Sequence, residues 1–282
     1  MTRRARSSAA ARVERGLAYL ALAAIVTFFL LPVLWMAITS VQPYALLTAV
    51  PPRVSFAAAT GQNYADLLGD PKFRRAVTAT VVTSVLSTAL ALLVAIPAGY
   101  ATGRLRFAGR AAYLFSILTV QIGPAVAFLI PLFLMMQRFG LIDTYPGLIL
   151  VFVLFVAPVA VWLLRGFFAV LPPGLERAAR MDGASRWRAF YQILLPLGTG
   201  GIWAVVLLIF ISVWGDLLIP LVLSFSRVVT LTVVASGFSG EQNINYGGAS
   251  AVAVLSALPA VILALAFRRH LIKGVTEGAV KQ

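Results

Sequence analysis

The segment Leu171–Leu197, LPPGLERAARMDGASRWRAFYQILLPL, is the one long polar interruption in a very apolar chain. The run Pro172-Pro173-Gly174 ends whatever precedes it, and a proline just inside a helix start favours a new helix. We therefore predict a short helix over residues 175–181. The pair Asp182-Gly183 predicts a turn after it, because glycine adopts positive φ without steric cost.

A second helix is predicted after the turn, with Ser185 as its N-cap. Its apolar residues fall on one stripe at helical spacing; they are Trp187, Phe190, Tyr191, Leu194 and Leu195. On the first helix, Leu175, Ala178 and Ala179 share a face, and Glu176 and Arg180 are spaced for a weak ion pair. Small alanines on one helix and aromatics on the other suit docking of a partner, and an ordinary polar loop between membrane spans is the alternative.

The composition of the whole chain indicates an integral membrane protein. Of its 282 residues, 61% are hydrophobic and 11% charged, and the mean hydropathy is +0.95. Such a chain cannot cover a water-exposed surface with polar groups. It has no cysteine, which excludes disulfides and thiolate metal sites.

Six apolar stretches meet the requirement of roughly 20 residues for a helix that crosses a bilayer. They are approximately Leu17–Thr39, Ala76–Ala101, Ala112–Met136, Pro146–Leu164, Gly198–Leu223 and Ala249–Phe267. The expected fold is thus an all-α bundle of six transmembrane helices over residues 17–270. A basic arm (1–16), expected to be unstructured, precedes the bundle, and a tail (271–282) follows it.

The distribution of basic residues predicts the orientation of the chain. Placing both termini in the cytoplasm puts seventeen of the 23 lysines and arginines inside, as the positive-inside rule requires. The six left outside are Arg53, Lys72, Arg74, Arg75, Arg138 and Arg227. A basic membrane face therefore explains the net charge of +14 better than nucleic-acid binding does.

Several short motifs resemble the permease subunits of bacterial ABC importers, in their carbohydrate or maltose-permease-like branch. Ala178-Ala179, Gly183, Ile193 and Leu195-Pro196 fall at the spacing of the EAA loop of that family. The run Gly140–Thr144 and the tail Gly278-Ala279-Val280-Lys281 are also similar to family motifs. The resemblance covers essentially the whole chain.

The resemblance implies a type I permease bundle in the bacterial inner membrane, forming half of a translocation pathway for a sugar or sugar-like solute. It implies a second permease subunit, two ATPase subunits and an extracytoplasmic solute-binding protein as partners. It also implies that the segment 171–197, here called the coupling loop, docks on an ATPase. The residues expected to do so are Glu176, Arg177, Ala178, Ala179, Asp182, Gly183, Ile193, Leu195 and Pro196.

The coupling loop departs from the family at one position, since Arg177 stands where the motif has its glutamate and Glu176 precedes it. Either Glu176 turns toward the ATPase, or that ATPase carries an acidic residue opposite Arg177. Neighbouring helical residues point about 100° apart, so both cannot face the same way.

Two polar residues within the spans are candidates for the translocation path, namely Gln121 and Asp216. A carboxylate at a bilayer centre costs about 2.5–3.5 kcal/mol, so it usually faces a cavity or a partner; a peripheral position near the membrane surface is the alternative for Asp216. The resemblance also implies that the last outer loop faces the binding protein, at Gly237, Phe238, Ser239 and Gly240.

The sequence argues against catalysis by this chain. Its lysines, Lys72, Lys273 and Lys281, are followed by Phe, Gly and Gln, so it has no phosphate-binding P-loop. ATP would be used by the partner subunits, and no cofactor or metal is expected on this chain. A membrane enzyme and an ion-coupled secondary transporter are the alternatives; ion coupling needs ionisable groups deep in the bundle, and only Asp216 is available.

Overall fold

The computed structural model describes residues 8–238 and 245–279. It is helical, and its contacts divide it into two compact units, residues 1–69 with 238–257 and residues 70–237 with 258–282. The first unit contains α1 (Ser8–Ser40), α2 (Tyr44–Leu47), the 3-10 turn η1 (Phe56–Ala58), α3 (Gln62–Gly69) and the start of α14 (Tyr246–Ala279). α1 begins inside the arm that was expected to be unstructured, and α14 continues far into the predicted tail.

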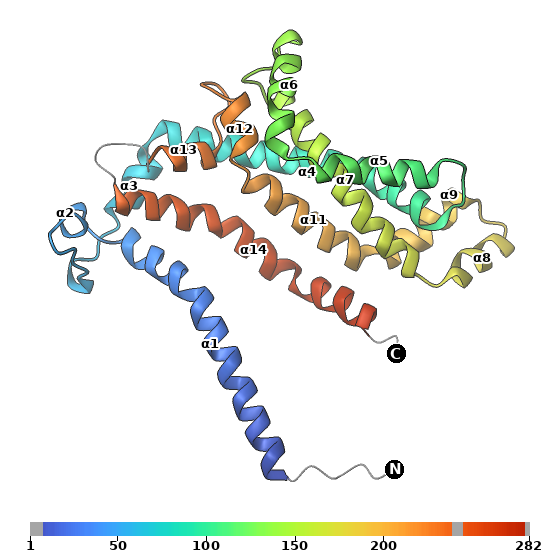
Figure 1. Cartoon of the computed structure of the whole chain (residues 1–282), viewed down its shortest axis with the longest axis horizontal. Coiled ribbons are helices and arrows are strands. Elements are labelled where there is room, and N and C mark those ends of the chain that lie inside the picture. The colour runs from blue at the N-terminus through green and yellow to red at the C-terminus, as the bar shows by residue number, and fades with distance from the viewer. Residues whose placement is uncertain (1–7, 239–244, 280–282) are drawn as a thin grey trace. The chain divides into compact units, whose positions relative to one another are not determined.

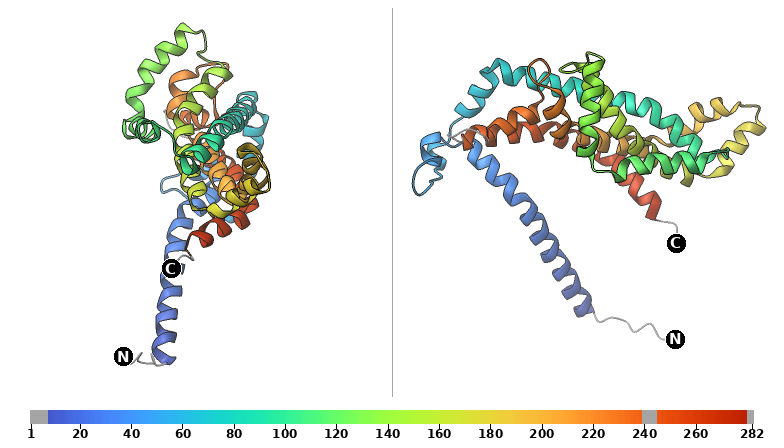
Figure 2. Two further views of the ribbon diagram at one scale, coloured as in Figure 1. Left: turned by 90° about the vertical axis from the view of Figure 1, so that its right-hand side faces the viewer. Right: turned by 45° about the horizontal axis from the view of Figure 1, so that its top comes forward.

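The second unit is built around α4 (Pro71–Arg104) and α7 (Tyr145–Val170), which lie side by side (Figure 1). Around them are α5 (Arg110–Ile122), α6 (Ala125–Arg138), α8 (Pro173–Met181), α9 (Arg186–Ala189), the π-helical turn η2 (Phe190–Leu194), α10 (Leu195–Leu197), α11 (Thr199–Trp214), α12 (Leu218–Leu223) and α13 (Leu231–Gly237). Figure 2 shows α8 and α9 at the end of this unit where α4 and α7 both end.

Glycines allow α4 and α7 to approach closely. A Cβ added to Gly99 would lie 2.7 Å from the Cβ of Leu164, and one added to Gly103 would lie 2.8 Å from the carbonyl oxygen of Arg165. Small residues at such crossings let two backbones gain dispersion contacts, which drive helix association where lipid supplies no hydrophobic force. The main core of the unit therefore lies between these two helices and α11.

In the first unit, the end of α1 is held by α3. The side chain of Asn63 donates to the carbonyl oxygens of Ser40 and Gln42 at 2.8 and 3.0 Å. The hydroxyls of Ser40 and Tyr64 lie 2.7 Å apart. Asn63 and Tyr64 thus have a structural role at the end of α1.

The structure modifies the prediction of six continuous spans. Within the described residues, four helices are long and apolar enough to cross a bilayer: Glu14–Ser40, Pro71–Arg104, Tyr145–Val170 and Tyr246–Phe267. A fifth arises if the pair Arg186–Leu197 and Thr199–Trp214, bent by 73°, is one span. The all-α membrane fold is confirmed, whereas the count of six is not reproduced.

The two other predicted spans are broken by glycine and proline. The stretch 112–136 divides into α5 and α6 at Gly123-Pro124, where Gly123 has an extended backbone (ψ 143°). The stretch 198–223 divides into α11 and α12 around Gly215. Because a proline cannot donate a backbone hydrogen bond and disfavours helix in the preceding residue, an apolar composition alone does not ensure one unbroken helix.

Candidate functional site

The coupling loop folds into the two short helices expected from its turn residues. Gly183 has φ +83°, and the amide of Ala184 donates to the carbonyl oxygen of Ala179 at 3.0 Å to close the end of α8. Ser185 caps α9, since its hydroxyl accepts from the amide of Arg188 at 3.2 Å. The glycine elbow and the serine cap are both confirmed.

A buried cluster of aromatic rings anchors the coupling loop to α4 and α7. The rings of Tyr100 and Phe190 are 4.5 Å apart between centroids, and each lies 6.1 Å from the ring of Phe168. Only 1% of Phe190 is exposed, and Phe168 is fully buried. Aromatic burial of this kind stabilises a contact by large apolar area as well as by ring geometry, so the loop is fixed to the ends of both helices.

One hydrogen bond determines how α8 is turned. The hydroxyl of Tyr100, on α4, donates to Oε1 of Glu176 at 3.1 Å. The guanidinium of Arg104 donates to the carbonyl oxygen of Pro172 at 3.3 Å, at the start of α8. Glu176 is consequently half-buried and bonded within the chain, and the expected pair with Arg180 is not formed among the described residues.

The remaining predicted coupling residues divide between the inside and the outside of the loop. Ala179 is buried, and Ile193 and Leu195 are half-buried. The exposed ones are Arg177, Ala178, Asp182, Gly183 and Pro196. Ala178, rather than Ala179, is therefore the alanine that another chain could reach.

The predicted apolar stripe of the second helix is also divided. Phe190 and Leu194 are buried, whereas Trp187 and Tyr191 are 61% and 58% exposed and stack on each other. Met181, at the end of α8, is 88% exposed. A single stripe requires a regular α-helix, but the π-helical turn η2 places an extra residue in that stretch and shifts the register.

Two features of the coupling loop cannot be predicted from local sequence. Tyr100 lies 76 residues from Glu176, and no local spacing connects them. Met181 is 88% exposed, and an isolated methionine in a polar helix end is the kind of residue that a partner surface can use.

The two candidates for the translocation path both lie beside a helix interruption. Gln121, two positions before the Gly123 break, donates to the carbonyl oxygen of Phe155 on α7 at 2.8 Å. Asp216 lies between α11 and α12, and its carboxylate accepts from the amide of Ile219 at 2.9 Å. Each side chain therefore has an internal hydrogen-bond partner close to a stretch of irregular backbone.

A second polar centre joins the α6–α7 connection to the segment after α12. The carboxylate of Asp143 accepts hydrogen bonds from the amides of Phe225, Ser226, Arg227 and Val228 at 2.9–3.1 Å, and from the hydroxyl of Ser226 at 2.8 Å. The amide of Asp143 donates to the carbonyl oxygen of Leu223 at 2.9 Å. This set of bonds is called the Asp143 contact below.

The Asp143 contact favours the ionised carboxylate. Burial by itself raises the pKa of Asp143, but the amides of Arg227 and Val228, the Ser226 hydroxyl and the Phe225 amide together lower the pKa from 3.8 to about 2. Asp143 has φ +57°, a conformation that non-glycine residues other than Asn and Asp rarely adopt. The run Gly140–Thr144 thus contains a residue whose backbone and side chain are both committed to one contact.

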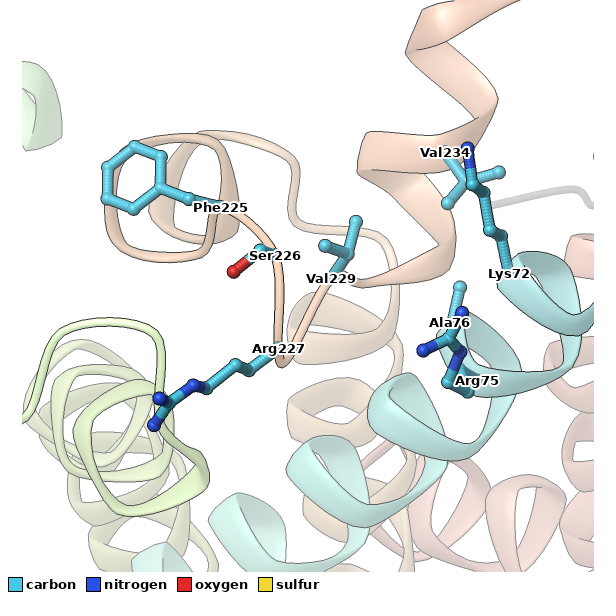
Figure 3. Close-up of a pocket in the computed structure, with 8 residues that line it drawn as sticks. All are labelled: Lys72, Arg75, Ala76, Phe225, Ser226, Arg227, Val229 and Val234. Carbon is cyan, nitrogen blue, oxygen red and sulfur yellow. The ribbon is translucent and has the colours of Figure 1, made fainter.

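A basic cavity of about 340 Å³ lies next to the Asp143 contact (Figure 3). Lys72, Arg75 and Ala76 of α4 line one side, and the rest of the lining comes from Phe225, Ser226, Arg227 and Val229 and from Val234 of α13. The side chain of Arg227 extends away from Lys72 and Arg75 (Figure 3). Three of the six basic residues predicted to lie outside are therefore gathered around one hollow.

The binding-protein contacts expected from the resemblance fall at the end of α13. Gly237 is the last residue of α13 and Phe238 follows it. Ser239 and Gly240 lie outside the described residues.

The long apolar helices, the interrupted spans and the two-helix loop define a polytopic α-helical membrane protein. Residues 95–277 match the family described as "Binding-protein-dependent transport system inner membrane component". The chain belongs to this family, and the resemblance to ABC importer permeases is confirmed.

Individual relatives cover nearly the whole chain. It is 32% identical to the trehalose transport system permease protein SugB of Mycobacterium tuberculosis, over 91% of this chain and 94% of that protein. It is 30% identical to the trehalose/maltose transport system permease protein MalG of Thermococcus litoralis, over 89% and 91%. These relatives agree with the carbohydrate branch.

A solved structure shows the same fold. A chain of a bacterial ABC transporter involved in the import of the acidic polysaccharide alginate superposes with a TM-score of 0.79, covering 94% of this chain and 99% of that chain at 23% sequence identity. This likeness supports the all-α permease fold.

Proposed function

We propose that this chain forms one half of the translocation pathway of a bacterial ABC importer for a sugar or sugar-like solute. Support comes from the family and from relatives whose names specify trehalose and maltose transport. A similar fold also occurs in a transporter solved in complex with an alginate pentasaccharide-bound periplasmic protein. The proposed partners are a second permease, two ATPase subunits that hydrolyse ATP, and a solute-binding protein.

The hydrogen bond from Tyr100 to Glu176 carries the proposal that the coupling loop docks on an ATPase. It fixes the orientation of α8, so that Glu176 points inward. Arg177, one helical step away, is exposed with Ala178, and Met181 and Trp187 add exposed apolar surface. This surface has small residues at Ala178 and Gly183 and apolar residues beside them, so it suits a partner that approaches closely.

The orientation of α8 supports the second of the two explanations for Arg177. Because Glu176 is occupied by Tyr100, we propose that the ATPase offers an acidic group opposite Arg177. A bare arginine against a basic surface would be repulsive, whereas an exposed ion pair contributes about 0.2–1 kcal/mol. Docking would then depend mainly on the shape of the loop and its apolar residues, with charge as a smaller selective contribution.

Gln121 and Asp216 are proposed to lie along the translocation path. Irregular backbone at membrane depth is tolerated where it is buried in protein or lines a water-filled cavity, and transporters place such interruptions at their solute sites. Both residues lie beside an interruption, which supports this placement. We further propose that the binding protein contacts Gly237, Phe238, Ser239 and Gly240 and the basic cavity of Figure 3.

Reconstitution into vesicles tests the function. Radiolabelled trehalose and maltose serve as probes. The complete importer should take up a sugar only when ATP is present on the side of the membrane that carries the ATPase subunits and when the binding protein is present. An ion gradient without ATP should support no uptake. Uptake that survives on an ion gradient alone would instead identify a secondary transporter.

The orientation can be tested separately, because the chain has no native cysteine. In intact cells, Thr60→Cys should react with an impermeant thiol reagent, and Arg186→Cys should react only after the membrane is permeabilised. Labelling of Arg186→Cys in intact cells would reverse the proposed N-in, C-in topology.

A further inference from the structure

A second basic hollow lies where α5 begins and α7 approaches its end. It has a volume of about 690 Å³, and its walls come from the connection before α5, the first turn of α5, and Arg165 of α7. None of its lining residues belongs to the coupling loop or to the Asp143 contact.

The hollow contains two arginines without an anionic partner. Arg110 and Arg165 both line it and are both half-buried. Among the residues whose side chains the structure describes, no carboxylate pairs with either guanidinium, and Nε of Arg165 is buried without a hydrogen-bond partner. A partly buried cation is costly unless an anion or a set of acceptors compensates it, so this pair requires an anion from outside the chain.

The surroundings of the arginines indicate a lipid. Apolar side chains of Phe107 and Leu114 line the same hollow, and the guanidinium carbon of Arg165 lies 4.9 Å from the centroid of the Trp162 ring. Tryptophan beside a cation at a helix end is typical of the headgroup level of a membrane. The hollow is also larger than a bare phosphate ion needs, which leaves room for the glycerol of a lipid.

We propose that this hollow binds the headgroup phosphate of an anionic phospholipid, held by Arg110 and Arg165. Guanidinium groups match phosphate oxygens with paired hydrogen bonds, and basic hollows between transmembrane helices commonly bind lipid headgroups. Two uncompensated positive charges favour a lipid with net negative charge over a zwitterionic one. The bound lipid would fill the gap between α5 and α7 and neutralise both arginines.

Native mass spectrometry of the full chain in detergent can test the proposal, with phosphatidylglycerol and phosphatidylcholine of the same acyl chains as probes. The chain should retain phosphatidylglycerol more strongly. An arginine that contacts the lipid headgroup contributes about fivefold to the affinity for anionic lipid, so Arg110→Gln should lower retention about fivefold. Arg110→Gln with Arg165→Gln should lower it by roughly 25-fold, while phosphatidylcholine retention should hardly change.

Arg106→Gln is the matched control, because it removes the same charge from the same connection at an exposed position that does not line the hollow. Equal loss in Arg106→Gln, or equal retention of both lipids by the unaltered chain, would overturn the proposal. So would displacement of phosphatidylglycerol by inorganic phosphate, which would identify a site for the free ion.

A partner protein is the remaining competitor. If assembly with the ATPase subunits expels the lipid and Arg110→Gln weakens that assembly, the hollow is a subunit contact and the lipid proposal is wrong. Arg110 has no side-chain hydrogen bond or ion pair within the described residues, so Arg110→Gln breaks no internal contact and decides the question even if the double variant fails to fold.

Discussion

The coupling loop and the Asp143 contact are two junctions of the same unit, and they are held in opposite ways. The coupling loop is anchored by buried rings and by two side-chain hydrogen bonds from α4, that of Tyr100 to Glu176 and that of Arg104 to the carbonyl oxygen of Pro172. The Asp143 contact is made by one carboxylate and a row of backbone amides. Apolar burial is non-directional, whereas hydrogen bonds to a charged group are directional and strong.

This difference suggests different mechanical properties for the two junctions. Rings that pack at several angles can slide slightly and keep most of their contact area, which suits a loop that must transmit movement from a partner. A carboxylate held by four amides tolerates little displacement, because every bond lengthens together. We therefore expect the Asp143 contact to be a rigid reference and the coupling loop to be the adaptable junction.

Removing the Asp143 carboxylate should have the largest effect on stability. Asp143→Ala leaves the amides of residues 225–228 without their acceptor and places alanine at φ +57°. Since hydrogen bonds to charged groups contribute about 1.5–3 kcal/mol each and water replaces part of them, we expect a loss of about 3 kcal/mol in the free energy of unfolding. The decrease in the midpoint of thermal unfolding in detergent measures this loss of stability.

Two further substitutions make the Asp143 experiment specific. Asp143→Asn should lose less, because asparagine tolerates positive φ and retains one acceptor oxygen. Asp66→Ala removes an exposed carboxylate that accepts a hydrogen bond from the side chain of Gln62, and it should hardly change the midpoint. Equal stability of Asp143→Ala and Asp66→Ala would show that the Asp143 contact is not a rigid reference.

Acid should weaken the same contact. The folded pKa of Asp143, about 2, lies below its ordinary value of 3.8, so the stabilisation is fully present above pH 3.8 and is lost as the pH falls toward 2. As the pH falls from 4 to 2, hydrogen exchange of the amides of residues 225–228 should become faster relative to the intrinsic exchange rate at each pH. This excess should be absent in Asp143→Asn. An unaltered excess in that variant would assign the acid sensitivity to another group.

The Gly183 elbow allows strain and docking to be separated. A Cβ at Gly183 meets no atom within 4 Å, but its φ of +83° strains a branched side chain. Gly183→Val should therefore lose about 1–2 kcal/mol of local stability and uncouple ATP hydrolysis from uptake. Gly183→Asn adds bulk with little strain, so uncoupling in both variants indicates blocked docking, and normal coupling in Gly183→Asn would leave strain as the cause.

Tyr100→Phe should have a smaller effect that concerns coupling more than folding. It keeps the ring cluster and removes only the hydroxyl that holds Glu176, a loss of about 1 kcal/mol. We expect more ATP hydrolysed per sugar transported in the reconstituted complex. Tyr191→Phe removes a hydroxyl from an exposed ring of the same loop and should leave the ratio unchanged; identical ratios in both variants would mean that Glu176 needs no orientation.

Arg177→Ala should have the smallest effect. Its side chain is exposed, and an exposed ion pair is worth about 0.2–1 kcal/mol, so uptake should fall by less than about fivefold. Arg177→Glu should lower uptake more than Arg177→Ala does if the ATPase carries an acidic group opposite residue 177. Better transport by Arg177→Glu would show that the opposing surface is basic.

The sequence by itself determined the class of fold and the local structure of the coupling loop. Its apolar stretches required a helical membrane bundle, because backbone polar groups in lipid must be satisfied within the helix. Gly183 and Ser185 specified the elbow and the cap, because turn and cap chemistry depends on neighbouring residues alone. The family motifs, matched residue by residue, identified the relatives.

Only the tertiary structure decided which residues of the loop face outward. Glu176 turns inward because of a tyrosine 76 positions earlier, and Trp187 is exposed because a π-helical turn changes the register behind it. The four amides around Asp143 have the same origin, because they belong to a segment 82–85 positions later in the chain. Each depends on contacts between segments distant in the chain, and the periodicity of one segment contains no information about its partner.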